Sequence, residues 1–272
     1  MSLSANWIAL DWGTTHVRAW AMSASATVLD ERSSDKGMGR LDPSQFEAAL
    51  HDLITGWTNG PVTAIACGMV GARQGWAEAA YSAVPCAPLP DGLTRAPTQD
   101  PDLTVMIIPG LSQDSPADVM RGEETQIAGF LALNPGWDGV LCLPGTHTKW
   151  VEVSAGEVVS FQTCMTGDLF AAITGHTVLR HSTGGTDWDD AAFDSALADT
   201  LSRPEKLAAR LFSLRAEGLL HGLSAGAARA RLSGLLIGAE LAATRPYWLG
   251  RQIGVIGAGA VAGLYVRALA AQ

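Results

Sequence analysis

Cysteine, basic residues and long apolar runs are all scarce in this chain of 272 residues. The four cysteines form no C-x-x-C pair and lie beside no histidine at metal-ligand spacing, which argues against a disulfide framework or a zinc site. Because 18 Lys and Arg face 27 Asp and Glu, the net charge of -9 argues against an extended nucleic-acid surface. No apolar run reaches the length of a membrane span, and the first residues lack the layout of a signal peptide. We therefore expect a soluble, cytoplasmic protein without nucleic-acid or membrane partners, whose thiols are reduced and mostly buried.

Three familiar catalytic motifs are missing or incomplete. The chain has no G-x-x-x-x-G-K-[ST] sequence, which excludes a P-loop enzyme. Residues 222–226 match the G-x-S-x-G nucleophile elbow, but helical sequence precedes them and no histidine follows Ser224, so the match is accidental. Residues 257–262 match the G-x-G-x-x-G/A dinucleotide fingerprint, yet the second strand and the ribose-binding acid of a Rossmann dehydrogenase do not follow. These glycines still allow a nucleotide to approach the start of a helix closely.

The first informative pattern that is present lies near the N-terminus. An apolar strand at residues 8–11 is followed by a Gly13-Thr14-Thr15 turn and an alternating strand at residues 17–22. Such a turn can offer backbone N–H groups and two hydroxyls to a phosphate, and Asp11 stands where a nucleotide-borne Mg²⁺ needs an oxygen ligand. The alternative is an ordinary β-hairpin in which Asp and Gly only form the turn.

A second turn of the same kind follows half a chain later. An apolar strand at residues 139–143 leads into Gly145-Thr146-His147-Thr148-Lys149, and a strand of alternating pattern follows. His147 and Lys149 are candidate phosphate contacts within this turn. Two phosphate-type turns, each opening a β-rich segment, indicate two similar domains that face one nucleotide.

The apolar pattern predicts a similar β-β-β-α plan in both halves, divided at Asn134-Pro135-Gly136. Residues 1–135 are expected to form the first domain and residues 136–272 the second, and the 47% of hydrophobic residues is ample for their cores. Strands are expected at residues 8–11, 17–22, 27–32, 62–67, 104–108, 139–143, 148–153, 157–164 and 252–256. Helices are expected at residues 43–57, 123–133, 169–180, 188–201, 204–215, 227–244 and from the last glycine turn to 271, with a loop-rich insertion at 83–101.

Two neighbouring acids, Glu123 and Glu124, stand at the expected start of a helix just before the second turn. One of them can point into the cleft between the two expected domains and remove a proton from an attacking hydroxyl. The alternative is that both acids only favour the positive end of the helix dipole. Asp168 is a rival for the role of base, or a more distant partner of the metal, and its own alternative is helix capping.

The loop at residues 68–76 follows a buried strand and carries Arg73, Gln74 and Trp76. Loops at strand ends often hold ligand contacts. Arg73 together with Arg121 would suit a substrate carboxylate, because a guanidinium can bind a carboxylate through two parallel hydrogen bonds. The alternative is a pair of surface arginines above a glycine turn. In a chain of negative net charge, an anionic substrate depends on local arginines of this kind.

Five segments resemble, in sequence and in order, those of the 2-dehydro-3-deoxygalactonokinase family. They are LDWGTT at residues 10–15, GMVGARQGW at 68–76, MRGEETQ at 120–126, LPGTHTKW at 143–150 and MTGDLF at 165–170. These kinases have the actin/hexokinase/heat-shock-chaperone ATPase fold. The resemblance therefore implies an α/β protein with two ribonuclease-H-like domains, whose mixed sheets are flanked by helices, around an interdomain nucleotide cleft. It also implies transfer of phosphate from ATP, with Mg²⁺, to the terminal (C6) hydroxyl of the sugar acid 2-dehydro-3-deoxy-D-galactonate in galactonate breakdown.

The resemblance also implies roles for single residues. Glu124 matches the position of the catalytic acid best, Glu123 is adjacent, and Asp168 remains its rival. The sugar acid is expected at Gly68, Arg73, Gln74 and Arg121. Nucleotide contacts are expected at Asp11, which also binds the metal, and at Gly13, Thr14, Thr15, Gly145, Thr146, His147, Thr148, Lys149, Gly257 and Gly259. A non-kinase member of the same fold, gated by nucleotide or acting like a chaperone, is the alternative, because it needs the phosphate loops but neither the Arg73 loop nor the acid at position 124. A homodimer is left open.

Overall fold

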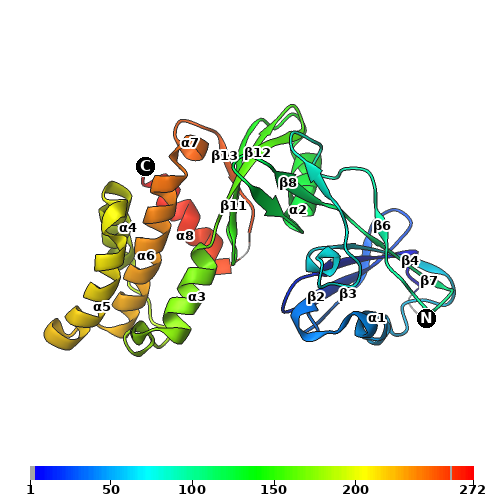
Figure 1. Ribbon diagram of the computed structural model, residues 1–272, viewed down its shortest axis with the longest axis horizontal. Coiled ribbons are helices and arrows are strands. Elements are labelled where there is room, and N and C mark those ends of the chain that lie inside the picture. The colour runs from blue at the N-terminus through cyan, green and yellow to red at the C-terminus, as the bar shows by residue number, and fades with distance from the viewer. Residues whose placement is uncertain (1–3, 258) are drawn as a thin grey trace. The chain divides into compact units, whose positions relative to one another are not determined.

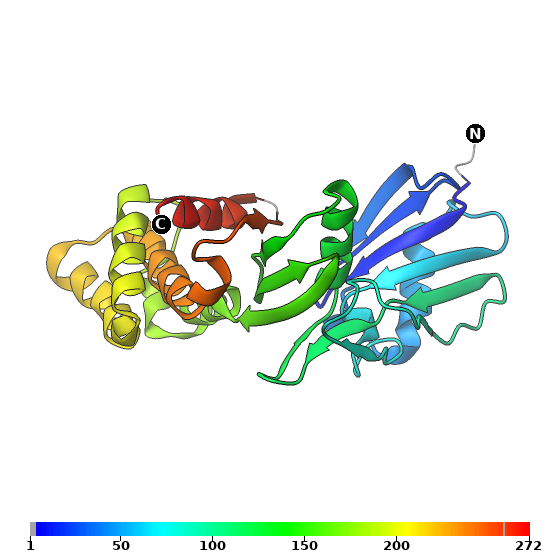
Figure 2. The same cartoon turned by 90° about the horizontal axis from the view of Figure 1, so that it is seen from above.

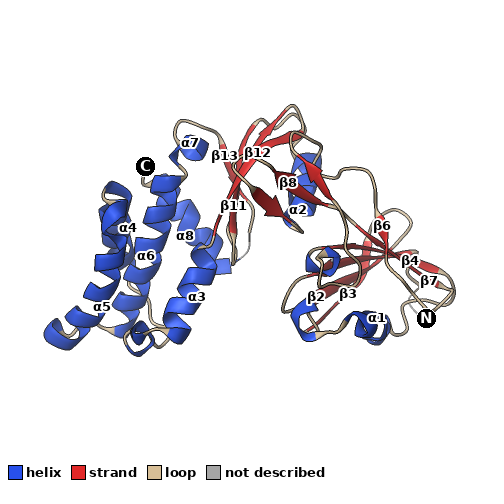
Figure 3. Cartoon of the chain, viewed as in Figure 1, coloured by secondary structure: helices blue, strands red, loops and turns tan. Residues whose placement is uncertain are grey.

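The computed structural model describes residues 4–257 and 259–272, and the chain forms two compact units (Figure 1). Unit 1 comprises the described residues of Met1–Gly136 with Gly156–Val159, and unit 2 comprises those of Trp137–Ala155 with Ser160–Gln272. Unit 1 is built mainly from strands, whereas unit 2 carries most of the long helices (Figure 3). Each unit contains a mixed sheet flanked by helices, so the expected α/β class with mixed sheets flanked by helices is confirmed.

Unit 1 is organised around one mixed sheet of strand order β3-β2-β1-β4-β7-β6. Its strands are β1 (Trp7–Trp12), β2 (Val17–Met22), β3 (Val28–Ser34), β4 (Val62–Cys67), β6 (Thr94–Arg95) and β7 (Leu103–Ile107). β1 pairs antiparallel with β2 and parallel with β4, and the blue strands and the cyan β4 lie side by side in Figure 2. The parallel strands β1, β4 and β7 therefore end at the same edge of the sheet.

Alternation along β1 decides which face of this sheet holds the core. Ile8, Leu10 and Trp12 are buried beneath helix α1 (Phe46–Ile54), which contributes Phe46 and Leu50 to the same core. The ring of Trp12 lies 5.1 Å from that of Phe46 and 6.0 Å from that of Trp76. Trp76, on the 68–76 loop, is thus a core residue, and its Nε1–H donates to the Pro97 carbonyl over 3.0 Å.

A second, three-stranded sheet of order β5-β8-β9 belongs to unit 1 and was not expected from the sequence. It consists of β5 (Tyr81–Ala83), β8 (Gly110–Gln113) and β9 (Asp118–Met120), and helix α2 (Glu123–Leu133) follows at once. These strands are three or four residues long, too short for an alternating pattern to be visible in sequence. The insertion at residues 83–101 is largely loop, as expected, and contains only the short β6 besides the end of β5.

Unit 2 has a mixed sheet of order β12-β11-β10-β13 on which helices pack. Its strands are β10 (Gly139–Leu143), β11 (Thr148–Ser154), β12 (Glu157–Cys164), whose first residues belong to unit 1, and β13 (Ile253–Val255). Its helices are α3 (Thr166–His176), α4 (Asp190–Ser202), α5 (Leu207–His221), α6 (Ala225–Ala243), α7 (Arg245–Trp248) and α8 (Gly259–Ala270). Two glycines let α4 and α6 approach closely, because a Cβ on Gly234 or Gly238 would lie 2.4 or 2.6 Å from a carbonyl oxygen of α4.

The expected β-β-β opening is present in both halves, as β1 to β3 and as β10 to β12. The helix expected at residues 43–57 is wrong in extent: residues 43–45 form a 3₁₀ turn and α1 ends at Ile54. Asp42 is the N-cap of this 3₁₀ turn, where its backbone N–H donates to Gln45 Oε1 over 2.8 Å. The helix expected at 204–215 extends to His221, and the one expected at 169–180 begins at Thr166 and ends at His176.

Within the described ranges, no helix is both long enough and apolar enough to cross a lipid bilayer. Cys67 and Cys142 are buried, and Cys86 and Cys164 are partly buried.

Candidate active site

The ends of β1 and β4 and the start of α2 meet at one edge of the main sheet of unit 1. β1 and β4 are parallel neighbours, with Asp11 opposite Cys67 in register. Gly68 has a φ of +93°, and a Cβ there would lie 2.8 Å from the Trp12 carbonyl oxygen and 3.4 Å from Asp11 Oδ1. Gly122 has a φ of +111°, and its Cβ would lie 3.3 Å from Gly68 Cα. Only glycine fits both positions, and this fit brings the first turn of α2 to the end of β1.

Glu124 is the most unusual side chain at this edge. It is fully buried, and its Oε2 accepts a hydrogen bond of 2.6 Å from the Gly122 N–H. Its Oε1 has no hydrogen-bond partner among the described residues. Burial raises the pKa of Glu124 from 4.5 to about 7, and the nearby charge of Glu123 adds to that rise. A carboxylate with a free oxygen and a pKa near neutrality is suited to accept a proton at physiological pH.

Glu123, the neighbouring acid, has a different environment. It is half-buried, and its Oε2 accepts from the Arg121 N–H over 3.2 Å. The two acids at the start of α2 are therefore not equivalent.

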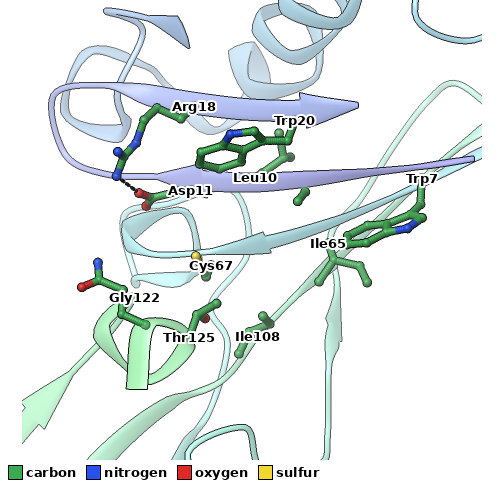
Figure 4. Close-up of a pocket in the computed structure, with 12 residues that line it drawn as sticks. Trp7, Leu10, Asp11, Arg18, Trp20, Ile65, Cys67, Ile108, Gly122 and Thr125 are labelled. Carbon is green, nitrogen blue, oxygen red and sulfur yellow. Dashed lines mark hydrogen bonds and ion pairs between the residues drawn. The ribbon is translucent and has the colours of Figure 1, made fainter. Parts of the chain in front are cut away.

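A cavity of about 380 Å³ opens on the same part of unit 1. Asp11, Arg18 and Cys67 line it together with apolar side chains such as Trp7, Trp20 and Ile65 (Figure 4). The guanidinium of Arg18 on β2 pairs with Asp11 Oδ2 at 2.5 Å. Gly122 and Thr125 of the α2 start also line the cavity, so Glu124 lies directly beside it in the chain.

Arg121 is a buried cation at the entrance to α2. Its Nη2 donates to the Ala79 carbonyl over 2.8 Å, and its guanidinium lies 4.2 Å from the ring centre of Tyr81. Its Nε and Nη1 are buried and have no hydrogen-bond partner in the described part of the chain. Arg73 and Gln74, by contrast, are exposed on the 68–76 loop. The two arginines expected to act together thus differ strongly in burial.

The first expected phosphate turn, between β1 and β2, is fixed by backbone hydrogen bonds within the turn and from residues 38–39. The Gly13 N–H donates to the His16 carbonyl, and the Gly13 and Thr14 carbonyls accept from the N–H groups of Met38 and Gly39, all over 2.9 Å. Thr14 and Thr15 are exposed.

The second turn, between β10 and β11, is exposed at Gly145, Thr146 and His147 but buried at Thr148 and Lys149. The Thr148 hydroxyl lies 2.9 Å from that of Tyr265, and Lys149 Nζ donates to Thr163 Oγ1 over 2.8 Å. β11 begins at Thr148, so both side chains belong to the buried part of a strand.

The first turn of α3 packs on this second turn. A Cβ on Gly167 would lie 2.3 Å from the Gly145 carbonyl oxygen, so only glycine allows this approach. The Asp168 N–H donates to the Thr146 carbonyl over 2.9 Å, and Asp168 Oδ2 lies 3.6 Å from His147 Nε2. Asp168 does not occupy the capping position, which belongs to Met165.

A second cavity, of about 580 Å³, lies in unit 2 above this turn. Its walls come from the 144–146 segment, the start of α3, the middle of α6 and the start of α8. Phe170 and Trp188 line it, and the guanidinium of Arg229 lies 4.9 Å from the ring centre of Phe170. Ala260 and Val261, within the glycine motif at residues 257–262, line the cavity as well, while Ala258 of that motif lies outside the described residues. Gly259 has a φ of +71°, and Gly257 lies close to Ala262.

Several side chains that line the two cavities were not predicted: Arg18, Phe170, Trp188 and Arg229. Three of them lie on helices or beside them, where an apolar pattern does not tell which face meets a cavity. Arg18 could have been found, because it stands opposite Asp11 in a hairpin.

The accidental nature of the G-x-S-x-G match is confirmed. Helix α5 precedes it, and Ser224 is the N-cap of α6, where its Oγ accepts from the Ala227 N–H over 3.2 Å.

The described residues hold no group of three or more His, Cys, Asp or Glu side chains arranged to bind a metal ion. Asp11 offers one carboxylate at the end of β1, and a nucleotide-borne Mg²⁺ takes its other ligands from phosphates and water.

A mixed α/β fold, a Gly–Thr turn between the first two strands of each mixed sheet and a buried acid at the start of a helix fit the class of sugar-acid kinases that the sequence resembles. Comparison with known proteins narrows this class to one family. The chain belongs to the 2-keto-3-deoxy-galactonokinase family, whose family model matches residues 11–272.

Three relatives illustrate this membership. "Probable 2-dehydro-3-deoxygalactonokinase DgoK1" of Rhizobium meliloti (strain 1021) is 39% identical over 281 residues, which cover 100% of this chain and 91% of the relative. The 2-dehydro-3-deoxygalactonokinase of Escherichia coli (strain K12) is 36% identical over 247 residues, 90% of this chain and 82% of the relative. A crystal structure of a candidate 2-dehydro-3-deoxygalactonokinase from Sinorhizobium meliloti is 39% identical, with a TM-score of 0.90 over 97% of this chain and 88% of that chain.

Proposed function

We propose that this protein transfers the terminal phosphoryl group of ATP to the C6 hydroxyl of 2-dehydro-3-deoxy-D-galactonate. Membership of the family supports the reaction, and one observation in the structure supports its chemistry. That observation is the buried Glu124, with a pKa of about 7, an unpartnered Oε1 and two near neighbours in sequence, Gly122 and Thr125, that line a cavity. The alternative of a non-kinase member of the fold is not favoured, because the relatives are named as kinases.

Glu124 is the general base in this proposal. Its Oε1 accepts the proton of the substrate hydroxyl while the hydroxyl oxygen bonds to the γ-phosphorus and ADP leaves with the bridging oxygen. The hydrogen bond from the Gly122 N–H to Oε2 holds the carboxyl group in place. Glu123 and Asp168 remain the competing candidates, although neither is buried.

The sugar-acid carboxylate binds Arg121 in this proposal, because Nε and Nη1 are desolvated and lack acceptors. Gly68, Arg73 and Gln74 of the neighbouring loop complete the substrate site. In this proposal, unit 1 therefore provides the sugar-acid site and the general base.

Arg121→Lys keeps the positive charge but removes the planar guanidinium and its two parallel N–H donors. The sugar-acid KM should therefore rise about tenfold or more, while the ATP KM should change little. Steady-state kinetics with each substrate varied in turn measures both values. Arg32→Lys is the matched control, because Arg32 also stacks on an aromatic ring, that of Trp57, and donates to backbone carbonyls. Equal changes in the two KM values for Arg121→Lys would contradict this placement.

ATP binds unit 2 in this proposal, with its base in the cavity walled by Phe170, Trp188, Ala260 and Val261. Gly145, Thr146 and His147 are exposed and contact phosphates, as do Gly13, Thr14 and Thr15 of the first turn. Thr148 and Lys149 are buried and support the turn from beneath.

Mg²⁺ bound by Asp11 is part of the proposal, since a carboxylate is the ligand that this ion prefers in nucleotide sites. When bound, the ion supplies positive charge that stabilises the transferring phosphoryl group. Arg18 pairs with Oδ2 of Asp11, so Oδ1 is the oxygen of this carboxylate that would hold the ion.

Asp11→Asn should raise the Mg²⁺ concentration needed for half-maximal turnover at least about tenfold, with the sugar-acid KM nearly unchanged. A Mg²⁺ titration at saturating ATP measures this. Asp35→Asn is the matched control, because Asp35 also pairs with an arginine, Arg40, at 2.5 Å. A wild-type Mg²⁺ dependence in Asp11→Asn would show that the first-turn assignment is wrong.

The proposed function is tested by ADP release with a panel of 2-keto-3-deoxy sugar acids. We expect release that depends on a sugar acid and is fastest with 2-dehydro-3-deoxy-D-galactonate. ATP consumption that is the same without any sugar acid would contradict the proposal. A homodimer and a cytoplasmic location remain predictions, to be tested by gel filtration and cell fractionation.

A further inference from the structure

The most elaborate buried polar cluster of unit 2 surrounds Glu240, a residue to which the proposed reaction gives no role. Glu240 lies on α6 and is 4% exposed. Its Oε1 accepts from Trp150 Nε1–H over 2.8 Å, and its Oε2 accepts from the Tyr265 hydroxyl over 2.7 Å and from the Thr166 hydroxyl. Burial raises the pKa of Glu240, and these three donors oppose that rise.

Each donor comes from a different element. Trp150 lies on β11, Thr166 is the first residue of α3, and Tyr265 lies on α8. β11, α3, α6 and α8 all belong to unit 2 (Figure 1). The Thr148 hydroxyl, at the end of the second turn, joins the cluster through Tyr265 over 2.9 Å. One carboxylate therefore links four segments that are far apart in the sequence.

Two of these donor residues also line the cavity of about 580 Å³ in unit 2. Thr166 and Tyr265 both line it, next to Gly145, Thr146 and Gly167. α3 rests on the second turn through Gly167, so the position of Thr166 also fixes how α3 meets Gly145. A change at Glu240 is thus transmitted to the cavity wall and to the exposed part of the turn.

We propose that Glu240 is a positioning residue for the nucleotide: by accepting hydrogen bonds from Thr166 and Tyr265 it holds α3 and α8 where they wall the cavity. Glu240 itself does not contact the nucleotide. The inference rests on the proposed function in one respect, the identity of the cavity's ligand as ATP.

The cluster works through its hydrogen bonds, so a side chain that keeps them should keep the function. In Glu240→Gln, Oε1 can still accept from Trp150, and Nε2 can donate to the oxygens of Thr166 and Tyr265 once both hydroxyls rotate. Tyr265→Phe and Thr166→Val each remove one hydroxyl and leave most of the side-chain volume. Glu240→Leu removes every acceptor at once.

Tyr265→Phe and Thr166→Val should each raise the ATP KM about tenfold, as expected of a lost hydrogen bond to a buried carboxylate. The sugar-acid KM should stay within about twofold, and Glu240→Gln should stay within about threefold of wild type for both substrates. Because both hydroxyls act on the same oxygen, the Tyr265→Phe/Thr166→Val double variant should lose less than the product of the two single effects. Glu217→Gln is the control, since Glu217 pairs with Arg231 of the same helix α6.

ATP binding by calorimetry and the melting temperature of each variant complete the test. Variants that melt earlier than wild type but keep its ATP KM and Kd, measured well below that temperature, would overturn the inference and leave Glu240 a purely structural residue. An ATP KM that rises equally in Glu240→Gln and Tyr265→Phe would overturn the hydrogen-bond account. If wild type bound no ATP and phosphorylated no sugar acid, the proposed function itself would fail, a result distinct from either.

Discussion

Glu124→Gln should lower kcat by about 10²–10⁴-fold, the range that general-base catalysis contributes, while both substrates still bind. Glutamine keeps the size of the side chain and can still accept from the Gly122 N–H, but it cannot take a proton from the hydroxyl. Steady-state kinetics with purified protein measures kcat, and calorimetry checks that ATP and the sugar acid still bind.

The pH dependence provides an independent check on the same residue. With a pKa of about 7, Glu124 ionises as the pH rises through neutrality, so the wild-type kcat/KM should rise with pH up to about 7 and then level off. The rise should be absent from whatever activity remains in Glu124→Gln. A wild-type profile that is already flat from pH 5.5 upward would contradict the base assignment.

As the pH rises through neutrality, the free energy of unfolding should fall while the activity rises. Because the pKa of Glu124 is raised in the folded protein, its contribution to stability is fully present below pH 4.5 and is lost as the pH rises through about 7. Glutamine carries no such penalty. We therefore expect Glu124→Gln to melt at or above the wild-type temperature at pH 8, which separates loss of the base from loss of the fold.

The competing acids provide the matched comparison. Glu123→Gln should cost much less, since its carboxylate accepts a backbone N–H and is half-buried. Asp168→Asn removes an exposed carboxylate beside His147. A Glu124→Gln enzyme with near-wild-type kcat beside an inactive Asp168→Asn enzyme would move the base to Asp168.

Gly167→Ala should produce the second large effect, a fall of about tenfold to a hundredfold in kcat/KM for ATP. Its Cβ would lie 2.3 Å from the Gly145 carbonyl and 2.9 Å from Thr146 Cα, so α3 and the second turn must move apart. Such overpacking typically costs about 1–3 kcal/mol. The same displacement shifts Gly145 and Thr146, the exposed residues proposed to contact phosphate.

Gly175→Ala on the same helix is the control for this substitution. A Cβ there meets no atom within 4 Å, so alanine should be neutral or slightly stabilising because it favours the helix. ATP kinetics and thermal melting of both variants measure the difference. Equal, small effects at the two positions would show that the contact between α3 and the turn does not shape the nucleotide site.

The elements with strong periodicity could be predicted from the sequence. β1, β2 and β10 alternate or run apolar over five or six residues, and the glycine–threonine turns between the strands were visible at once. The strands β5, β8 and β9 could not be predicted, because they are only three or four residues long and because β5 pairs with the distant β8, with Tyr81 opposite Gly110. Helix ends also shifted, since 3₁₀ turns at Pro43 and Pro204 precede the α-helices.

The sequence could propose residues for the candidate site but not their environment. The residues alone left Glu123 and Glu124 open, the family resemblance favoured Glu124, and the complete burial of Glu124 depends on Gly68 and Gly122, which let α2 approach β1. Thr148 and Lys149 looked equivalent to Thr146 in the sequence. However, the buried strand β11 begins at Thr148, so Thr148 and Lys149 are buried whereas Thr146 is exposed. The cluster around Glu240 joins residues up to 117 positions apart, a separation that no local pattern reveals.

Transfer of phosphate from ATP to the C6 hydroxyl of the sugar acid is measured by ³¹P NMR of the products. With wild-type protein, ATP, Mg²⁺ and 2-dehydro-3-deoxy-D-galactonate, we predict ADP and one new phosphomonoester resonance. That resonance should be split into a triplet by the two protons on C6, because the terminal carbon carries the reacting hydroxyl. Inorganic phosphate as the only new signal, or a doublet from phosphorylation at C4 or C5, would contradict the account.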